Sequence, residues 1–368
     1  MRVAMVGLRA PWGPEGGVEA AMASLAPRLV QRGVEVTIYC RGRYNVLGPG
    51  EHNGVRLVDV GTIYSKHLEA FVHTGRSMPA AIRGADLVHV HATGPALWSW
   101  APRLFGVPSV VTVHGLDWQR DKWGPAARLA LLTGAWAAGR FPNRLITVSH
   151  DLAAHYARKG VDATWIPNGV DPIEAVPLAE AGLEGLESGR FLLLLGRLVP
   201  EKGIDGLLRA YKASGIELPL LIVGGGSYSE DYVQRLKAAA PPGVRLTGPL
   251  HGRRRDALLT HARALVLPSL LEGFPLAPLE SLSAGRPVLL SDIPPHRELL
   301  GESEAGWLVE ASTERWSEAL RRVVDASDEE LRRRGEAGRA RVRQHYDWGQ
   351  IAERTAAVYG EAAAGVRV

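Results

Sequence analysis

The chain has 368 residues, of which 46% are hydrophobic and 22% are charged, and its formal net charge is +4. This length allows about two domains with cores of their own, and this mild, mixed charge suits acidic small molecules or lipid headgroups better than nucleic acid. A single cysteine excludes an intrachain disulfide and a cysteine-rich metal site. No apolar run reaches the roughly 20 residues of a membrane-spanning helix and the chain begins directly with a strand-like run, so we expect a cytoplasmic protein.

The first half of the chain alternates strand-like and helix-like segments. Short runs rich in Val, Ile and Leu are separated by amphipathic stretches such as 19–31. Strands that alternate with helices in this way indicate a parallel sheet covered by helices on both faces. The strand-like runs are 2–6, 34–39, 55–60, 87–91, 109–114 and 145–149.

The loop after the first strand contains two adjacent glycines, Gly16 and Gly17, which open a helix. They would let the backbone approach a phosphate or a sugar closely, although a loop that needs only turn geometry would use them as well. The loop is not Gly-x-Gly-x-x-Gly, and the second strand ends without an acid for an adenosine ribose, which disfavours NAD. Arg41 or Arg43 could instead meet a 2′-phosphate, which leaves NADP open.

His114 stands at the carboxyl end of the strand-like run 109–114. A histidine at this edge of a parallel sheet could bond to a sugar hydroxyl or move a proton, or it could simply cap the sheet. His89 and His91 occupy alternate positions on the preceding strand, and we expect at most one of them to face a ligand.

Tryptophans and basic residues gather around an apolar helix-like stretch, 129–138, in the first half. Such a helix can seat a protein on an anionic membrane surface, or its apolar face can belong to the core. The residues concerned are Trp118, Trp123, Trp136, Arg120, Lys122, Arg128, Arg140 and Arg144.

The second half repeats the alternation, which predicts a second doubly wound domain and a cleft between the two. The joint is expected in 167–172 or in the loop that continues to about 189, and a last amphipathic helix is expected from 348 to about 364. The stretch 314–343 has dense Arg and Glu at helical spacing, which indicates a solvated helical face. The strand-like runs are 191–195, 219–223, 244–246, 264–268, 287–291 and 306–309.

Two cations, Arg197 and Lys202, follow the first strand of this half, beside Gly196 and Gly203. They could hold a diphosphate without a metal ion, or they could be ordinary exposed side chains. Leu250 and His251 follow a later strand, where a nucleotide base could stack or bond to the backbone. His251 could equally well be simply exposed.

The most informative run extends from Glu272 to Glu280, between a buried strand and a helix that ends before Gly285. The start of a helix at the carboxyl edge of a parallel sheet favours a phosphate, because its N–H groups are free and its dipole is positive. Two carboxylates on either side of that point would accept hydrogen bonds from hydroxyls. A nucleotide sugar has hydroxyls on both sides of its phosphates, because its diphosphate lies between a ribose and a hexose. The plainer alternative is that Glu272 caps the helix and Glu280 faces solvent.

With these motifs, the chain resembles the retaining glycosyltransferases of family 4, which have the GT-B fold, from Arg2 to about Tyr359. The specific marks are the Glu272-x7-Glu280 motif and the loop 196–203, and the supporting marks are 166–171, Gly16–Gly17 and His114–Gly115. The stretches 16–19, 36–41 and 66–69 are similar to a subgroup described as rhamnosyltransferase-like.

The resemblance implies a role for each marked residue. Arg197 and Lys202 would bind the donor diphosphate, Glu280 the ribose and Glu272 the sugar hydroxyls. His114 would contact the sugar near the reacting carbon and, with Glu272, Arg197 and Lys202, form the catalytic group, for which no nucleophile is assigned. The remaining expected donor contacts are Gly16, Gly17, Leu250, Gly273, Phe274, Pro275 and Leu276. No metal or other cofactor is expected.

The sequence thus predicts an α/β protein of two Rossmann-like domains that face each other across a cleft, with the last helix crossing back to the first domain. The acceptor-side domain would comprise 1–170 plus 348–368, and the donor-binding domain 171–347. The expected activity is metal-independent, retaining transfer of a sugar from a nucleoside-diphosphate donor to a hydroxyl of a glycan, a lipid-linked glycan or a small molecule. We also expect peripheral contact with the inner membrane face. The alternatives are a nucleotide-sugar epimerase and a non-catalytic nucleotide-sugar-binding protein.

Overall fold

A computed structural model describes residues 1–13, 16–65, 68–120, 123–226 and 230–365. Lys122, and positions 66 and 67 of the stretch compared with the rhamnosyltransferase-like subgroup, lie outside this set. The chain divides into two compact units, which are described separately below. Unit 1 comprises Met1–Asn168 with Trp348–Val368, and unit 2 comprises Gly169–Asp347.

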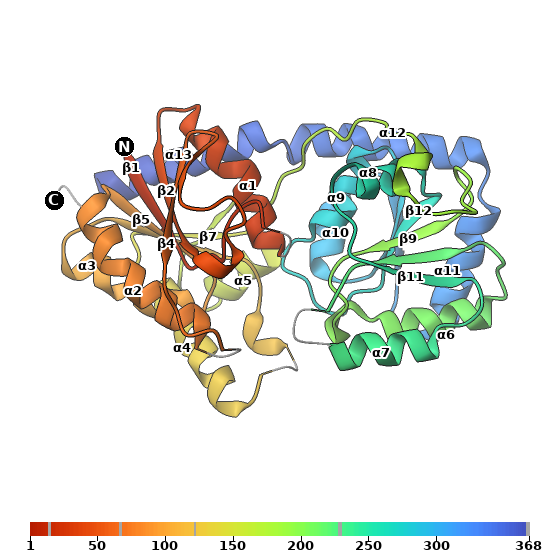
Figure 1. The fold of residues 1–368 in the computed structure, drawn as a ribbon, viewed down its shortest axis with the longest axis horizontal. Coiled ribbons are helices and arrows are strands. Elements are labelled where there is room, and N and C mark those ends of the chain that lie inside the picture. Colours follow the sequence, from red (N-terminus) through yellow and green to blue (C-terminus); the bar gives the residue numbers. More distant parts are fainter. Residues whose placement is uncertain (14–15, 66–67, 121–122, 227–229, 366–368) are drawn as a thin grey trace. The chain divides into compact units, whose positions relative to one another are not determined.

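Unit 1 is built on an eight-stranded sheet in the order β3-β4-β2-β1-β5-β6-β7-β8 (Figure 1). Every described pairing is parallel except the antiparallel pair β3–β4. The strands are β1 (Arg2–Val6), β2 (Glu35–Arg41), β3 (Gly50–His52), β4 (Val55–Val60), β5 (Leu87–His91), β6 (Ser109–Val113), β7 (Arg144–Thr147) and β8 (Thr164–Trp165). Its helices are α1 (Gly17–Val30), α2 (Glu69–Gly84), α3 (Trp100–Leu104), α4 (Pro125–Arg140), α5 (His150–Ala157) and α13 (Trp348–Ala364), with the 3-10 turns η1 (Gly42–Tyr44), η2 (Pro95–Trp98) and η3 (Asp117–Gln119).

The last helix, α13, completes the core of unit 1. In Figure 1 it runs, in blue, beside α1 in red, and its apolar side chains share one buried cluster with those of α1 and β1. Ile351, Val358 and Tyr359 are each at most 3% exposed. Burial of such side chains stabilises a fold by about 1.5–3 kcal/mol each, so α13 is an integral part of this unit. The expected return of the last helix to the first domain is confirmed.

Unit 2 has a six-stranded, all-parallel sheet in the order β11-β10-β9-β12-β13-β14. The strands are β9 (Leu192–Leu195), β10 (Leu220–Val223), β11 (Val244–Gly248), β12 (Ala264–Leu267), β13 (Val288–Ser291) and β14 (Gly306–Val309). The helices are α6 (Ile204–Ser214), α7 (Glu230–Ala239), α8 (Gly252–His261), α9 (Leu276–Ser283), α10 (Pro294–Leu300), α11 (Thr313–Asp325) and α12 (Asp328–His345), with the 3-10 turns η4 (Leu178–Ala181) and η5 (Pro200–Lys202).

The four central strands of unit 2 are buried along their whole length, which explains their continuous runs of Leu, Ile and Val. The arginine- and glutamate-rich tail is only partly the solvated face that the sequence predicts. Trp316, Leu320 and Val323 of α11 pack into the core beside α6. The two-domain α/β architecture is confirmed.

Candidate active site

The loops after β9 and β12 touch at the carboxyl edge of the sheet of unit 2. Gly203 has a φ of 66°, and a Cβ atom there would lie 2.2 Å from the carbonyl oxygen of Pro268. The Leu270 N–H donates to the Glu201 carbonyl over 2.8 Å. Only glycine tolerates both the left-handed backbone and this close approach. The contact therefore fixes the turn η5 against the loop that leads into α9.

This contact brings Lys202 to Glu272, 70 positions further along the chain. The Lys202 Nζ lies 2.5 Å from Glu272 Oε1, and the two side chains are only 15% and 12% exposed. Ser269 Oγ donates to the same oxygen over 2.6 Å. Burial raises the pKa of Glu272, but Lys202, His296 and the two hydrogen bonds outweigh burial and hold the pKa below its ordinary value. Glu272 is therefore an ionised, buried carboxylate with a cation beside it.

Glu280 lies on α9 and pairs with Arg255 of α8. Arg255 Nη1 donates to Glu280 Oε1 over 3.0 Å, and Arg255 Nη2 donates to Asp256 Oδ1 over 2.7 Å. Burial raises the pKa of Glu280, and Arg255 offsets only part of that rise. Burial also disfavours charge on Arg255, but Glu280 and Asp256 outweigh it and raise the pKa of the guanidinium. Glu280 thus does not face solvent as in the plainer alternative.

Between the two carboxylates, the start of α9 has no side-chain cap, because its N-cap residue is Pro275. Phe274 is buried with its ring centroid 5.3 Å from that of Tyr346. Its side chain therefore anchors the loop. Pro275 has no N–H to donate, and the donor roles of Gly273, Phe274 and Leu276 stay predictions.

The other predicted donor-site residues of unit 2 lie at the ends of neighbouring strands. Arg197 is half-buried directly after β9, beyond Gly196. Leu250 is buried between β11 and α8, and His251 is exposed beside it. The roles assigned to these residues stay predictions.

In unit 1, Gly16 precedes α1 with a φ of 114°. A Cβ atom there would lie 1.9 Å from Glu19 Oε2, and the other oxygen of Glu19 accepts the Arg9 N–H over 3.3 Å. Glycine at 16 therefore allows Glu19 to fold back over the start of its own helix. This local account does not depend on a ligand, and the phosphate role of Gly16 and Gly17 stays a prediction.

His114 lies directly after β6 and contacts a stack of imidazoles. His91 Nδ1 is 3.2 Å from His114 Nε2, and the His89 ring lies 4.0 Å, centroid to centroid, from that of His91. His89 is held at both nitrogens, by Tyr359 Oη at 2.8 Å and Thr112 Oγ1 at 2.7 Å. These side chains share a face because residues two apart on a strand point the same way. The cavity between them is only about 20 Å³, too small for a sugar.

Arg41 does not serve the NADP alternative. Its guanidinium is buried, pairs with Glu69 at 3.4 Å and donates to the Gly7 carbonyl over 3.3 Å. Burial lowers the pKa of Arg41. The residue is thus part of the polar interior of unit 1. Arg43 is exposed, with its guanidinium carbon 5.7 Å from the centre of the Tyr64 ring.

The apolar helix near the tryptophans is α4, and its larger apolar side chains face outward from unit 1. Leu129, Leu132 and Trp136 are 66%, 39% and 59% exposed, whereas the buried positions are the small residues Gly134, Ala135, Ala137 and Ala138. The alternative that the apolar face of the helix belongs to the core thus holds for its small residues, whereas these three large side chains lie on the exposed face. Trp118, in contrast, is a core residue. Within the described residues, no helix is long and apolar enough to cross a membrane.

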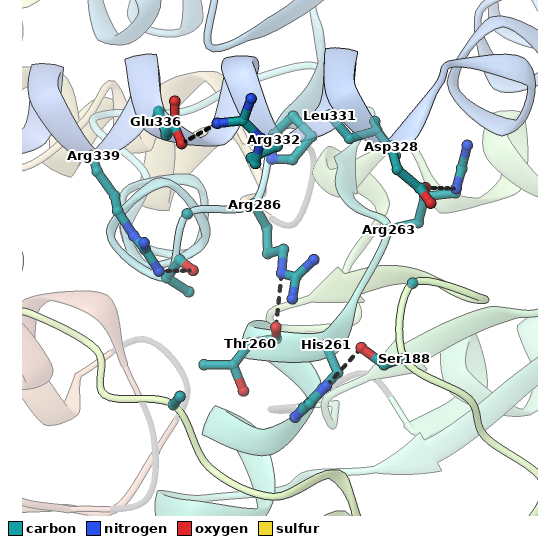
Figure 2. Close-up of a pocket in the computed structure, with 15 residues that line it drawn as sticks. Ser188, Thr260, His261, Arg263, Arg286, Asp328, Leu331, Arg332, Glu336 and Arg339 are labelled. Atoms are coloured by element: carbon teal, nitrogen blue, oxygen red, sulfur yellow. Dashed lines mark hydrogen bonds and ion pairs between the residues drawn. The ribbon is translucent and has the colours of Figure 1, made fainter.

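A larger, arginine-rich cavity of about 480 Å³ lies elsewhere in unit 2 (Figure 2). Its arginines precede β12 and β13 or lie on α12, so it opens at the opposite edge of the sheet from Lys202 and Glu272. Arg286 donates to the Thr260 carbonyl over 2.7 Å and Arg339 to that of Ala284 over 2.9 Å. These carbonyls end α8 and α9, where cations satisfy free oxygens and the helix dipole. Arg286 and Arg339 are thus explained as helix caps, and Arg332 pairs with Glu336 within α12.

The sequence did not predict Arg255 and Ser269, which bond to Glu280 and Glu272, nor the bond between His91 and His114. Arg255 lies in an Arg-Arg-Arg-Asp run at the start of α8, which could have suggested a partner for a nearby acid. Ser269 follows a buried strand at the predicted edge and carried a positional signal. No local pattern identifies His91 as the partner of His114, because the bond joins two strands.

Comparisons with known proteins agree with this architecture. Residues 15–174 match the family model "Glycosyltransferase Family 4", and residues 183–341 match "Glycosyl transferases group 1". The alpha-maltose-1-phosphate synthase of Mycolicibacterium smegmatis is 26% identical over an alignment that covers 99% of this chain and all of that protein.

Among solved structures, the sucrose-phosphate synthase of Thermosynechococcus elongatus superposes with a TM-score of 0.83 at 22% identity, covering 99% of this chain and all of that one. HepE of Anabaena, solved in complex with UDP-glucose, gives a TM-score of 0.80 at 16% identity over 98% of this chain and 99% of that one. These structural likenesses carry the fold alone. The named relatives favour a transferase over an epimerase or a non-catalytic binding protein.

Each unit thus has a matching family model and a sheet, parallel apart from β3, with polar residues at its carboxyl edge. The fold matches GT-B structures over nearly its whole length. The chain is therefore a glycosyltransferase with the GT-B fold, in which a family 4 domain is followed by a group 1 domain.

Proposed function

We propose that unit 2 binds a nucleoside-diphosphate sugar at the carboxyl edge of its sheet. Glu280 accepts hydrogen bonds from the ribose hydroxyls, and Arg197 and Lys202 bind the diphosphate. Glu272 and the N–H groups of Gly273, Phe274 and Leu276 bind the transferred sugar, whereas Gly16 and Gly17 approach the phosphates. The Lys202–Glu272 pair is the observation that carries this proposal.

The pair fits such a ligand because it holds one positive and one negative group side by side in a mostly buried place. A nucleotide sugar presents a diphosphate and a hydroxylated ring in succession, so it can satisfy both groups at once. Each group stays hydrogen-bonded in the absence of ligand, which avoids an unpaired buried charge. HepE of Anabaena, solved with UDP-glucose, supports a donor of this class.

The reaction we propose is sugar transfer with retention and without a metal ion. The bond from the anomeric carbon to the diphosphate oxygen breaks, and an acceptor hydroxyl oxygen bonds to that carbon on the same face. The hydroxyl proton passes to the leaving diphosphate oxygen. Arg197 and Lys202 offset the charge that develops on the diphosphate, and His114 contacts the sugar, so positioning and leaving-group stabilisation supply the catalysis.

A binding screen tests the donor site. UDP, GDP, dTDP and ADP, each alone and as common sugar conjugates, are added to the protein with and without EDTA, and the melting temperature and then the calorimetric Kd are measured. We expect one nucleotide to bind equally well in EDTA, and its conjugate to bind tighter. If no nucleotide shifts a folded sample, the assignment of Lys202, Glu272 and Glu280 to a donor site is wrong.

The product tests the stereochemistry. With the donor identified, candidate sugar, sugar-phosphate and lipid-linked acceptors are supplied, and the anomeric configuration of the first product is read by NMR. Retention requires the donor configuration in the product, and an inverted product contradicts the same-face step.

We further propose that unit 1 makes peripheral contact with the inner face of an anionic membrane through α4, in a cytoplasmic enzyme with a membrane-linked acceptor. Leu129, Leu132 and Trp136 form an exposed apolar stripe, and Arg128 and Arg140 stand exposed on the same helix. Apolar burial together with attraction to anionic lipid is how such helices bind a surface.

Vesicle flotation tests this contact, with phosphatidylcholine alone and with added phosphatidylglycerol. The parent should float with the anionic vesicles. The double variant Leu129→Ser, Trp136→Ser should not, whereas the control Leu308→Ser, an exposed leucine on β14 of unit 2, should float like the parent. Equal flotation of all three proteins rules out α4 as the contact.

A further inference from the structure

His91 and His114 form a bonded pair at the carboxyl edge of the sheet of unit 1. Their rings are nearly parallel, with centroids 5.5 Å apart and an interplanar angle of 24°, and His91 Nδ1 lies 3.2 Å from His114 Nε2. β5 and β6 pair in parallel register with His91 opposite Thr112. His114 follows Thr112 by two residues, so its side chain lies on the same face as that of His91. The bond therefore follows from the sheet.

Exactly one of the two bonded nitrogens must carry the proton, and the surroundings of His91 favour its own Nδ1. His91 is fully buried, and its other nitrogen, Nε2, has no hydrogen-bond partner among the described residues. If that nitrogen carried the proton, a buried N–H would be left without an acceptor. Unpaired buried N–H groups are rarer in folded proteins than under-satisfied acceptors. The favoured arrangement is a His91 Nδ1–H that donates to an unprotonated His114 Nε2.

This arrangement fixes the remaining nitrogen of His114. Burial lowers the pKa of His114 to about 4, with Asp117 acting weakly in the opposite direction, so the ring is neutral at neutral pH. A neutral ring with an unprotonated Nε2 carries its proton on Nδ1. His114 Nδ1 is not among the buried atoms without a partner, and no described residue bonds to it. His114 thus offers an N–H to whatever enters beside it.

We propose that His91 is a positioning residue: it donates from Nδ1 to His114 Nε2, holds the ring, and leaves His114 Nδ1–H as a hydrogen-bond donor to a substrate oxygen. His114 therefore stabilises by donation and does not take a proton from the acceptor hydroxyl. The catalytic consequence rests on the proposed transferase function, whereas the bond and the tautomer do not.

The full-length protein labelled with ¹⁵N-histidine tests the tautomer directly. Long-range ¹H–¹⁵N spectra show which ring nitrogen is protonated, and the His114 signals are assigned by their loss in His114→Gln. We expect a protonated Nδ1 and an unprotonated Nε2. A protonated His114 Nε2 in the parent overturns the proposal, whatever the outcome of the nucleotide screen.

The matched variants His91→Asn and His91→Leu test the bond. The two side chains are similar in size, but only Asn has an N–H near the position of Nδ1. In His91→Leu, the His114 Nε2 resonance should move toward that of a ring nitrogen without a donor, and in His91→Asn it should stay near the parent value. No movement in His91→Leu overturns the proposal.

Turnover separates positioning from a merely structural role. In His91→Leu, kcat should fall by about tenfold, as expected for one lost hydrogen bond, with the Kd for the nucleoside diphosphate unchanged. His91→Asn should keep most of the parent kcat. Equal losses in both variants, or a parallel loss of nucleotide affinity, would indicate a structural role and overturn the proposal. Melting temperatures of both variants confirm that they are folded.

Discussion

The two units differ in the kind of side-chain pairs that lie at the carboxyl edges of their sheets. At the ends of β5 and β6, unit 1 places neutral imidazoles held by uncharged hydrogen bonds, whereas the loops and helices after β9, β11 and β12 of unit 2 place charged side chains in opposite-charge pairs. Both arrangements avoid an unpaired buried charge, but they prepare for different ligands. Neutral donors suit hydroxyls, and paired charges can be shared with a diphosphate. Under the proposed function, unit 1 would contact hydroxyls and unit 2 would bind the diphosphate.

The largest effect should come from unit 2, at Lys202. Lys202→Ala removes a cation from the proposed leaving group and leaves Glu272 without its ion-pair partner, so kcat should fall by about 10²–10³, as for loss of one transition-state donor. Lys212→Ala, an exposed lysine on α6, is the matched control and should keep parent turnover. Steady-state kinetics check both, and a Lys202→Ala rate within threefold of the control contradicts the role.

Mild acid should lower the stability of unit 1 more than that of unit 2. The pKa of His114 and of His73 is lowered by burial to about 4, and that of His89 to about 3. Because the unfolded chain binds these protons near pH 6.5 and the folded chain does not, the free energy of unfolding falls as the pH drops from about 6.5 to about 4. Each pKa unit is worth about 1.4 kcal/mol, which makes roughly 3 kcal/mol for His114.

Unit 2 contains one fully buried imidazole among the described residues, His296, and the lowered pKa of Glu272 costs stability only below about pH 4.5, the ordinary value for that group. Between pH 6.5 and 4.5 we therefore expect unit 1 to loosen first. Limited proteolysis at pH 7 and pH 5, with fragments identified by mass spectrometry, measures this order. Earlier cleavage within 169–347 at pH 5 would contradict it.

A smaller effect is expected at Glu280. Glu280→Gln keeps the size of the side chain but weakens its bonds to a ribose and to Arg255. The binding free energy of the nucleoside diphosphate should therefore become less favourable by about 1–3 kcal/mol. Asp256→Asn perturbs the same Arg255 without touching the proposed ribose contact, and should weaken binding less. Calorimetry decides, and unchanged affinity in Glu280→Gln removes its ribose role.

The smallest effect tests the uncharged bonding of unit 1. Tyr359→Phe deletes the hydroxyl that bonds to His89 Nδ1, which should lower the free energy of unfolding of unit 1 by about 1 kcal/mol. Amide hydrogen exchange of β5 reports this locally. Val358→Phe is a comparison variant that disturbs the packing of α13 and keeps the Tyr359 hydroxyl. If Tyr359→Phe leaves the exchange of β5 unchanged, the bond between this hydroxyl and His89 is not stabilising.

The sequence predicted the parallel sheets and the loops that carry the candidate site, because strands buried on both faces are continuous apolar runs. It missed β3 and β8, which have three and two residues and no such run. The end of α9 and both ends of α13 were also predicted, from Gly285 after α9 and from the amphipathic pattern of α13.

The partners of the candidate residues could not be predicted. Glu272 was recognised from its position, but its bond to Lys202 depends on how Gly203 packs on Pro268, and nothing periodic relates residues 70 positions apart. Arg255 likewise reaches Glu280 from a different helix. Side-chain pairing between elements requires their relative placement, which local pattern does not contain.

The position of α13 has a consequence for the order in which the protein can fold. The Tyr359 hydroxyl that bonds to His89 lies 270 positions later in the chain. During synthesis the first sheet leaves the ribosome long before that helix, with the surface that α13 covers still open to water. Closing so long a loop is slow relative to local folding. The first domain should therefore reach its final stability after the second, and a chain that stalls late should expose its first half to proteases and chaperones.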